Sequence, residues 1–562
     1  MADFDTLGGR PATTTLKWWS VRNFKSLLYA ITPLEGLTAI TGANSAGKSS
    51  LLQTLLLVAQ SADQEVTLNG NLIRLGVPRD VIRAGTSSFA IACIATIRMG
   101  NERSEWSFDI TLRPTVSGLR VSEFEVTRDS ETVLVATDSR VTEKTRAHVD
   151  PDGQFGDTLL RVREVQGSIA PAHTYVSFNG FTPIALHTRA ESKLVLRDLK
   201  RTFSLAAIRE DRDIASQFTD LVLSNFYHTR AERSPGPATD AIRSVLGTAL
   251  LDDASQDRLS KRTLDALLTE LANQDEENEW QRIPVRGVVS LAQRRTPRHL
   301  ALLMPSIAAA YQGLVASNEM ISRVVQTVRY VGPLREEPQV VSKSATRSRH
   351  TPVGLRGELT AELLHTRTAR VRYWDWEGTM HRTSLKAAVS LWSARLGIGD
   401  QVSVEDQGKL GRGLRISVNG VARDLTMVGV GASQLLPVLS AVLEAPAGSV
   451  VLLEQPELHL HPSVQSRLAD FLLFARHDIS LVVETHSEYL ITRLRRWVAE
   501  GQAKPNQIHI LFAEPSADGT DVRNLKLNEL GNLNDWPEGF FDSRDTEAHA
   551  IVKAIAERRH LE

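Results

Sequence analysis

The stretch Gly42-Ala43-Asn44-Ser45-Ala46-Gly47-Lys48-Ser49 matches the phosphate-binding pattern G-x-x-x-x-G-K-[ST] at every fixed position. Glycines in such a loop let successive backbone N–H groups face a phosphate, and the following helix directs its positive end to the same point. Lys48 is expected to reach the β- and γ-phosphates of a nucleotide, and Ser49 to ligate Mg²⁺. The predicted nucleotide-binding residues are Gly42, Asn44, Ser45, Ala46, Gly47, Lys48, Ser49 and Ser50.

The residues on either side of this loop supply the context that the motif requires. Residues 37–41 are expected to form a strand that runs straight into the loop. Residues 49–59 are rich in leucine at helical spacing and predict a helix that begins at the end of the loop. A strand at 16–22 precedes both. The order strand, loop, helix therefore supports a nucleotide site.

A second half of the site is expected much later in the chain, at residues 450–457 (VVLLEQPE). Four apolar residues predict a short parallel strand that is buried on both faces. Glu454 stands at its end, where a carboxylate is needed because Mg²⁺ prefers oxygen ligands. Ser49 and Glu454 are thus the predicted metal ligands, and the long separation of the two halves predicts a large insertion between them.

After Glu454, helices and strands are expected to alternate. Residues 462–476 predict a helix, 479–483 a buried strand and 487–500 an amphipathic helix, which together imply a parallel crossover. His486 follows the second strand, where a neutral imidazole can hydrogen-bond a γ-phosphate or the attacking water. The alternating histidines at 459 and 461 are expected to be structural, because no third partner cluster for a metal is evident.

The rest of the chain divides into regions of different character. Residues 89–135 alternate apolar and polar positions and predict an antiparallel sheet beside the nucleotide site. Helical periodicity at 214–227, 240–251 and 264–272 predicts a mainly helical insertion, and a strand resumes near 328–333. The expected parts are an N-terminal ATPase lobe (1–139), the insertion (140–325), a C-terminal ATPase lobe (326–515) and a C-terminal extension (516–562).

Composition narrows the class of protein. The 562 residues carry a net charge of −1, so no global charge indicates a polyanion partner. Cys93 is the single cysteine, which excludes an intramolecular disulfide and a cysteine-cluster zinc site. No run of about 18 apolar residues predicts a transmembrane helix, and the first residues do not resemble a secretory signal. We therefore expect a cytoplasmic protein that does not enter a membrane.

A further anion-binding helix start is predicted at residues 428–437 (VGVGASQLLP), just before the acidic strand. Glycines and a serine precede an apolar helix, which is a suitable arrangement for binding an anion. A second anion site so close to the first is unusual for an enzyme with one site. It is explained if this surface covers the nucleotide that is bound by a second subunit.

Taken together, these motifs resemble the ABC-type ATPases of the SMC, RecF and OLD-like group. The similarity lies in residues 21–27 (VRNFKSL), 454–462 (EQPELHLHP), Thr485-His486-Ser487 and 429–434, which take the places of that group's motifs. Residues 330–336 (YVGPLRE) and 536–541 (WPEGFF) are similar to prokaryotic AAA-like ATPases of antiphage defence systems, such as the Septu ATPase subunit. The insertion carries none of this resemblance.

The resemblance implies an α/β fold, namely a P-loop ABC-type ATPase head with a mixed sheet, an antiparallel β lobe and a large, mainly helical insertion. It implies ATP and Mg²⁺ as cofactors, and a homodimer or higher homo-oligomer in which two subunits sandwich ATP. In that arrangement Lys48, Ser49, Glu454 and His486 of one subunit face Gly431 and Ser433 of the other. It further implies an operon-encoded effector, such as a nuclease, with DNA as another candidate partner.

Two positions depart from the pattern of that group. The usual Asp-Glu pair at the end of the acidic strand is replaced by Glu454 and Gln455. An amide orients water but does not accept its proton, and general-base help is worth about 10²–10⁴-fold. Hydrolysis is therefore expected to be slow unless Glu457 or His486 compensates, so the predicted catalytic residues are Glu454, Gln455, Glu457 and His486. Gly429 stands where the group has its signature serine.

Three functions follow as alternatives. The first is a defence ATPase that senses or clamps invading nucleic acid and controls a separate effector. The second is a DNA repair or chromosome-handling ATPase, whose hydrolysis would respond to DNA with a steep salt dependence. The third is a scaffold that ATP holds together without being hydrolysed, which Gln455 suggests.

Overall fold

The structure describes the segments that contain the expected nucleotide site and most of the elements around them. A computed structural model describes residues 13–61, 65–99, 102–116, 118–139, 141–149, 158–166, 168–169, 173–188, 196, 199–200, 203–210, 218, 261–273, 281–285, 305–341, 348–375, 377–537, 550–551 and 553. The predicted helix at 240–251 lies outside these residues, and so does the one at 214–227 apart from Phe218.

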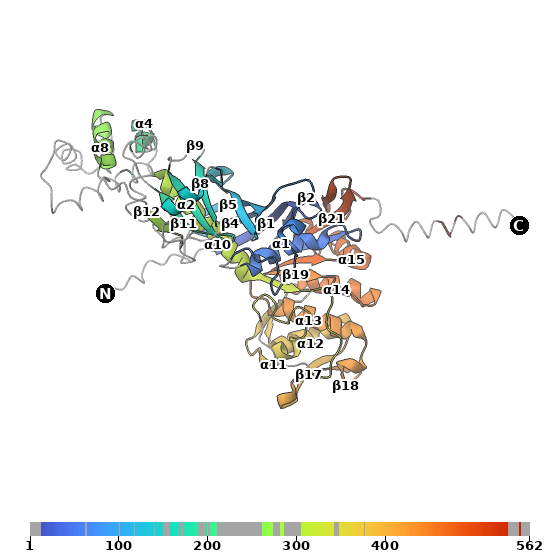
Figure 1. Cartoon of the computed structure of the whole chain (residues 1–562). Helices are drawn as coiled ribbons and strands as arrows, with labels where there is room; N and C mark the ends of the chain where they lie inside the picture. The colour runs from blue at the N-terminus through green and yellow to red at the C-terminus, as the bar shows by residue number, and fades with distance from the viewer. Residues whose placement is uncertain are drawn as a thin grey trace.

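A parallel group of strands forms the centre of the fold (Figure 1). Its order is β13 (Val328–Val331), β19 (Val450–Glu454), β20 (Ser480–Glu484), β3 (Leu37–Gly42) and β21 (Ile508–Ser516), and each neighbouring pair is parallel. These strands come from three distant parts of the chain. The predicted strands before the phosphate loop, at the acidic segment and before His486 are confirmed as neighbours in one sheet.

An antiparallel part continues the same sheet. β22 (Gly519–Leu525) pairs with β21 and lies parallel to β2 (Leu27–Pro33), and β2 pairs with β1 (Thr13–Phe24). The sheet then runs through β4 (Phe89–Met99), β5 (Glu102–Pro114), β6 (Leu119–Arg128), β7 (Glu131–Thr137), β8 (Thr158–Val165), β10 (Thr174–Asn179), β11 (Thr182–Thr188) and β12 (Gln281–Pro284), with β9 (Ser168–Ile169) beside β8. The predicted α/β fold with an antiparallel lobe is confirmed.

The insertion at 140–325 is expected to be mainly helical, but the structure shows strands in it as well. It contains helices, namely α2 (Glu143–Val149), α4 (Leu205–Glu210), α8 (Lys261–Asn273) and α10 (Pro305–Thr327), and α8 covers the predicted helix at 264–272. It also supplies β8 to β12, so the antiparallel sheet continues past residue 139. The reason is burial: side chains such as Leu160, Val176 and Leu186 complete the core that β5 to β7 begin, and such packing decides strand formation.

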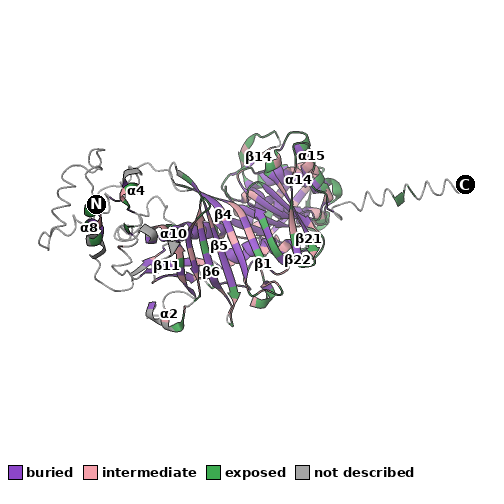
Figure 2. Cartoon of the chain, turned by 90° about the horizontal axis from the view of Figure 1, so that it is seen from above, coloured by how far each residue is buried: buried purple, intermediate pink, exposed green. Residues whose placement is uncertain are grey.

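The central strands are covered on both faces. Val450 and Leu452 point into a core that includes α10 and α1 (Lys48–Gln60). Val451 and Leu453 point into a second core with α13 (Val430–Glu444), α14 (Pro462–Phe474) and α15 (Glu488–Ala499). Alternate residues of a strand face opposite sides of a sheet, which explains why this strand is wholly apolar. Figure 2 shows buried residues along the strands of both parts of the sheet.

The remaining elements form a smaller lobe beside α13 (Figure 1). It contains helices α11 (Thr360–Thr366) and α12 (Leu385–Leu396), hairpin β14 (Val371–Trp374) and β15 (Met380–Thr383), and a sheet of β16 (Gln401–Asp406), β17 (Arg412–Val418) and β18 (Val421–Asp424). Short 3₁₀ turns are η1 (Pro78–Val81), η3 (Gly408–Leu410), η4 (Leu425–Met427) and η5 (Pro505–Gln507). None of the helices in the described residues has the length and apolar character needed to span a membrane.

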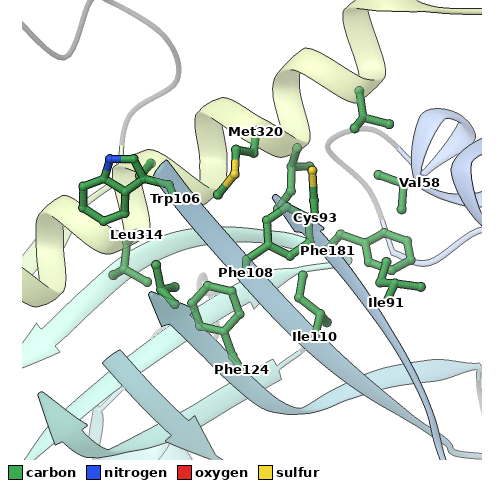
Figure 3. Close-up of a cluster of buried hydrophobic side chains, with 14 of the residues drawn as sticks. Val58, Ile91, Cys93, Trp106, Phe108, Ile110, Phe124, Phe181, Leu314 and Met320 are labelled. Carbon is green, nitrogen blue, oxygen red and sulfur yellow. The ribbon is translucent and has the colours of Figure 1, made fainter. Parts of the chain in front are cut away.

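Helix α10 is the main support of the antiparallel part. Leu314 and Met320 of this helix pack over Trp106, Phe108 and Phe124 of the sheet, as Figure 3 shows. The same helix also contacts α1 and β19. One helix therefore links the antiparallel part to the central strands that carry the predicted site.

Truncation of Leu314, which is fully buried, tests this support. Leu314→Ala is expected to lower the free energy of unfolding by about 2–5 kcal/mol, because the lost side chain leaves a cavity that the core fills only in part. Leu410→Ala is the control: that side chain is 72% exposed, and its loss is expected to change stability by less than about 0.5 kcal/mol. Equal denaturation midpoints for both variants would contradict the packing.

Candidate nucleotide site

The phosphate loop has the backbone that its sequence predicts. Gly42 ends β3 with φ of 134°, and a Cβ there would lie 2.0 Å from the carbonyl oxygen of Ala513 on the neighbouring strand. Gly47 has φ of 75° and precedes the first turn of α1. Ala46 is buried, while Asn44 and Ser45 are exposed on the outer side of the loop. The loop is thus anchored at its ends and presents its middle to solvent.

Lys48 lies beneath this loop. Its Nζ donates to the carbonyl oxygens of Ala43 at 2.5 Å and Gly42 at 3.2 Å. Burial lowers the pKa of Lys48, and the carboxylate of Glu484 opposes that shift. The charge of Lys48 therefore lies at the start of α1. The helix dipole is also positive at this end, so both favour a bound anion such as a phosphate.

Glu484 is the residue that sequence reasoning missed. It ends β20, and its Oε2 accepts a hydrogen bond of 2.7 Å from the hydroxyl of Ser49. Burial raises the pKa of Glu484, whereas the bond from Ser49 and the charge of Lys48 lower it. A signal for it exists in the sequence, because β19 and β20 are both short apolar strands that end in glutamate.

Glu454 stands beside Glu484, since the two residues are register partners on parallel strands. The hydroxyl of Tyr330 on β13 donates to Oε1 of Glu454 at 2.8 Å. Burial and the nearby charge of Glu484 raise the pKa of Glu454 to about 7. Two carboxylates that face each other in a poorly solvated site cannot both ionise without cost, so they favour a bound cation.

The other predicted catalytic residues occupy the turns after these two strands. Gln455 has a left-handed φ of 44°, and its backbone N–H donates to the carbonyl oxygen of Glu484. Glu457 is buried and accepts a 2.7 Å bond from the backbone N–H of His486. Burial raises the pKa of Glu457. The imidazole of His486 is exposed, and burial of its inner part and the charge of Lys48 lower its pKa.

The donor set fits a magnesium ion that is shared with a nucleotide. Ser49, Glu454 and Glu484 offer oxygen atoms at one edge of the sheet. In the part of the chain that the structure describes, no group of three or more His, Cys, Asp and Glu side chains is arranged to hold a metal. Mg²⁺ commonly takes only one or two carboxylates and completes its shell with phosphates and water. The protein ligands present match that requirement.

The predicted second anion site lies at the start of α13. Gly431 lines a hollow of about 480 Å³ together with the exposed Met427 and His459 and the buried Leu460. The hydroxyl of Ser433 is buried and donates to the carbonyl oxygen of Val430 at 2.7 Å. Gly429, Gly431 and the exposed Val430 leave this helix end open to solvent. His461 caps α14 by accepting from the backbone N–H of Ser463, which supports its structural role.

Family comparisons agree with the site. Residues 37–184 and 397–492 match the family described as "AAA domain, putative AbiEii toxin, Type IV TA system". Residues 504–550 match a second family, described as a protein of unknown function, DUF3696. The first match spans both halves of the nucleotide site, so these two segments are similar to an AAA ATPase domain. A comparison with curated proteins finds no match.

Solved structures with a similar arrangement are SMC head domains. The Pyrococcus furiosus head with an extended coiled coil, bound to the C-terminal domain of ScpA, is 13% identical with a TM-score of 0.35, over 97% of this chain and 100% of that one. An SMC head bound to the C-winged helix domain of ScpA is 12% identical with a TM-score of 0.36, over 92% of this chain and 98% of that one. The Thermotoga maritima SMC head is 9% identical with a TM-score of 0.32, over 91% of this chain and 99% of that one. A likeness this distant says nothing about activity or partners.

The raised pKa of Glu454 predicts a pH-dependent metal affinity. Mg²⁺ must displace a proton that Glu454 holds below its pKa of about 7, so binding of Mg²⁺ with an ATP analogue is expected to be about tenfold weaker at pH 6 than at pH 8. Calorimetric titration at the two pH values measures the difference. Glu484→Gln removes the neighbouring charge and is expected to shift this dependence to lower pH.

The nucleotide itself titrates in this range. Its contribution is common to the wild-type protein and the Glu484→Gln variant, so the difference between the two proteins reports on the carboxylates. The same pH dependence in both proteins would contradict the coupling between Glu454 and Glu484.

Proposed function

We propose that this protein binds Mg²⁺-ATP between the phosphate loop and the ends of β19 and β20, and acts as an ABC-type ATPase. The observation that carries the proposal is the bond from Ser49 on the loop to Glu484 on β20, next to Glu454. The bond joins the phosphate motif to β20, which lies beside the acidic strand β19, so segments far apart in sequence meet at one edge of the sheet. The match to an AAA ATPase domain supports the same conclusion.

Each residue of the site has a role in this proposal. Backbone N–H groups of residues 43–48 bind the phosphates, and Lys48 neutralises the β- and γ-phosphates. Ser49, Glu454 and Glu484 hold Mg²⁺, which neutralises charge on the phosphates when it is bound. His486 is exposed beside Lys48 and is free to orient the γ-phosphate or a water molecule. Gln455 orients that water but does not deprotonate it.

The start of α13 supports a dimer that closes around ATP. Its first residues are exposed and include two glycines whose backbone can approach an anion. Val430 is 50% exposed and Met427 is 73% exposed. These are apolar side chains that a second subunit would cover when the helix end of one subunit meets the phosphate loop of the other. Gly431 and Ser433 would then lie near the partner's γ-phosphate.

We further propose that the dimer controls a separate effector, a nuclease encoded beside it, in defence against phage. The sequence likeness to antiphage ATPases supports this role, and the matched family's description names a toxin of a toxin–antitoxin system. Purification with the neighbouring gene products, and phage challenge of cells that carry Lys48→Ala, would test it. Unchanged protection in that variant would contradict the role.

Loss of the lysine beneath the loop tests nucleotide binding directly. Lys48→Ala is expected to weaken ATP binding at least about a hundredfold, because a charge-assisted contact to the phosphates is lost. Binding of a fluorescent ATP analogue measures the change. Lys386→Ala on α12 is the matched control, because that lysine is exposed. Equal affinities in the two variants would contradict the proposed site.

A second candidate function, an ATP-held scaffold, is favoured by Gln455. If the amide limits proton transfer, wild-type turnover is slow and Gln455→Glu raises it by at least about tenfold, within the range that general bases supply. Steady-state phosphate release measures turnover, and light scattering with and without ATP reports the dimer. Brisk wild-type turnover that Gln455→Glu does not raise would contradict the scaffold and assign proton transfer to another group.

A further inference from the structure

Two residues outside the nucleotide motifs hold the acidic strand end in place. Tyr330 and Arg335 belong to one short segment that follows α10, and both are buried against the end of β19. We propose that Tyr330 and Arg335 are positioning residues that fix Glu454 and so set the affinity of the site for Mg²⁺. This inference rests on the proposed function, because it assigns a regulation of the same site.

Tyr330 controls the side chain of Glu454. It lies on β13 as the register partner of Leu452, two residues before Glu454 on β19. From there its hydroxyl donates to Oε1 at 2.8 Å. A carboxylate whose one oxygen is held in this way has a fixed plane, and its other oxygen keeps its lone pairs for a cation.

Arg335 controls the backbone of the same residue. Its Nη2 donates to the carbonyl oxygen of Glu454 at 2.9 Å, and its Nη1 donates to that of Gln455 at 2.8 Å. Gln455 has a left-handed φ, which side chains other than glycine adopt rarely. The two bonds hold the chain in that conformation. They also place a buried positive charge next to Glu454 and Glu457.

The two contacts restrain Glu454 at different points. The phenol fixes the carboxylate, and the guanidinium fixes the backbone carbonyl group of the same residue. Both come from a segment joined directly to α10, which packs on the antiparallel part and touches β19. Tyr330 and Arg335 therefore connect the end of α10 to the end of β19.

Matched variants separate positioning from general packing. Tyr330→Phe removes only the hydroxyl, and Arg335→Lys keeps the charge but cannot span two carbonyl groups. Tyr373→Phe and Arg476→Lys are the controls. Tyr373 is as buried as Tyr330, and Arg476 is a buried arginine that also donates to two successive carbonyl oxygens, those of Val442 and Leu443. Both controls lie outside the proposed site.

The measurement uses Mn²⁺ as a paramagnetic substitute for Mg²⁺. Electron paramagnetic resonance of the full-length protein with a non-hydrolysable ATP analogue gives the Mn²⁺ affinity, and fluorescence gives the analogue's affinity in EDTA. Tyr330→Phe and Arg335→Lys are each expected to weaken Mn²⁺ binding about tenfold, as loss of a residue behind a metal ligand does. Metal-free binding of the analogue stays at the wild-type value, and so does Mn²⁺ binding by both controls.

Wild-type Mn²⁺ affinity in Tyr330→Phe would overturn the inference, and so would an equal loss in the control variants. Tyr330→Phe preserves the shape of the side chain, so it decides the question even where Arg335→Lys fails to fold. Absence of any analogue binding by the wild-type protein would instead overturn the proposed function and this inference with it. The two failures are therefore distinguishable.

Discussion

The parallel pairing of β19 with β20 places Glu454 and Glu484 side by side in a buried position, and the rest of the site is arranged around this pair. Two buried carboxylates repel each other strongly where water does not screen them. Ser49 donates to one and Tyr330 to the other, while Lys48 lies close enough to stabilise Glu484. These contacts offset the repulsion in part and leave a site that favours a divalent cation.

The topology explains how such a pair arises from distant segments. β3 carries the phosphate loop and lies next to β20, which lies next to β19. The long stretch between the two halves of the site does not interrupt this order, because its strands extend the sheet on the far side of β1 and β4. Helix α10 then returns the chain to β13 at the other edge. An insertion of this kind enlarges the protein without separating the parts of the site.

Local patterns allowed much of this structure to be predicted. The phosphate loop, α1, β19 and β20 have short-range signals, and each forms where the sequence places it. Glu484 escaped prediction because its role depends on which strands are neighbours, and neighbours follow from topology rather than from local pattern. Strands β8 to β12 were missed because α10 and the adjoining sheet bury them. Tyr330 and Arg335 were noticed as a motif, yet their contacts to Glu454 are visible only in three dimensions.

Electrostatics relates the departure at Gln455 to the presence of Glu484. A glutamate at 455 would add a carboxylate to a site that already contains Glu454, Glu457 and Glu484, all of which have pKa values raised by burial. Each additional negative charge makes ionisation of the others less favourable. An amide at 455 avoids this penalty while Glu484 supplies a second carboxylate for the metal. In the proposed Mg²⁺-ATP site, this arrangement would favour binding of the metal over acceptance of a proton from water.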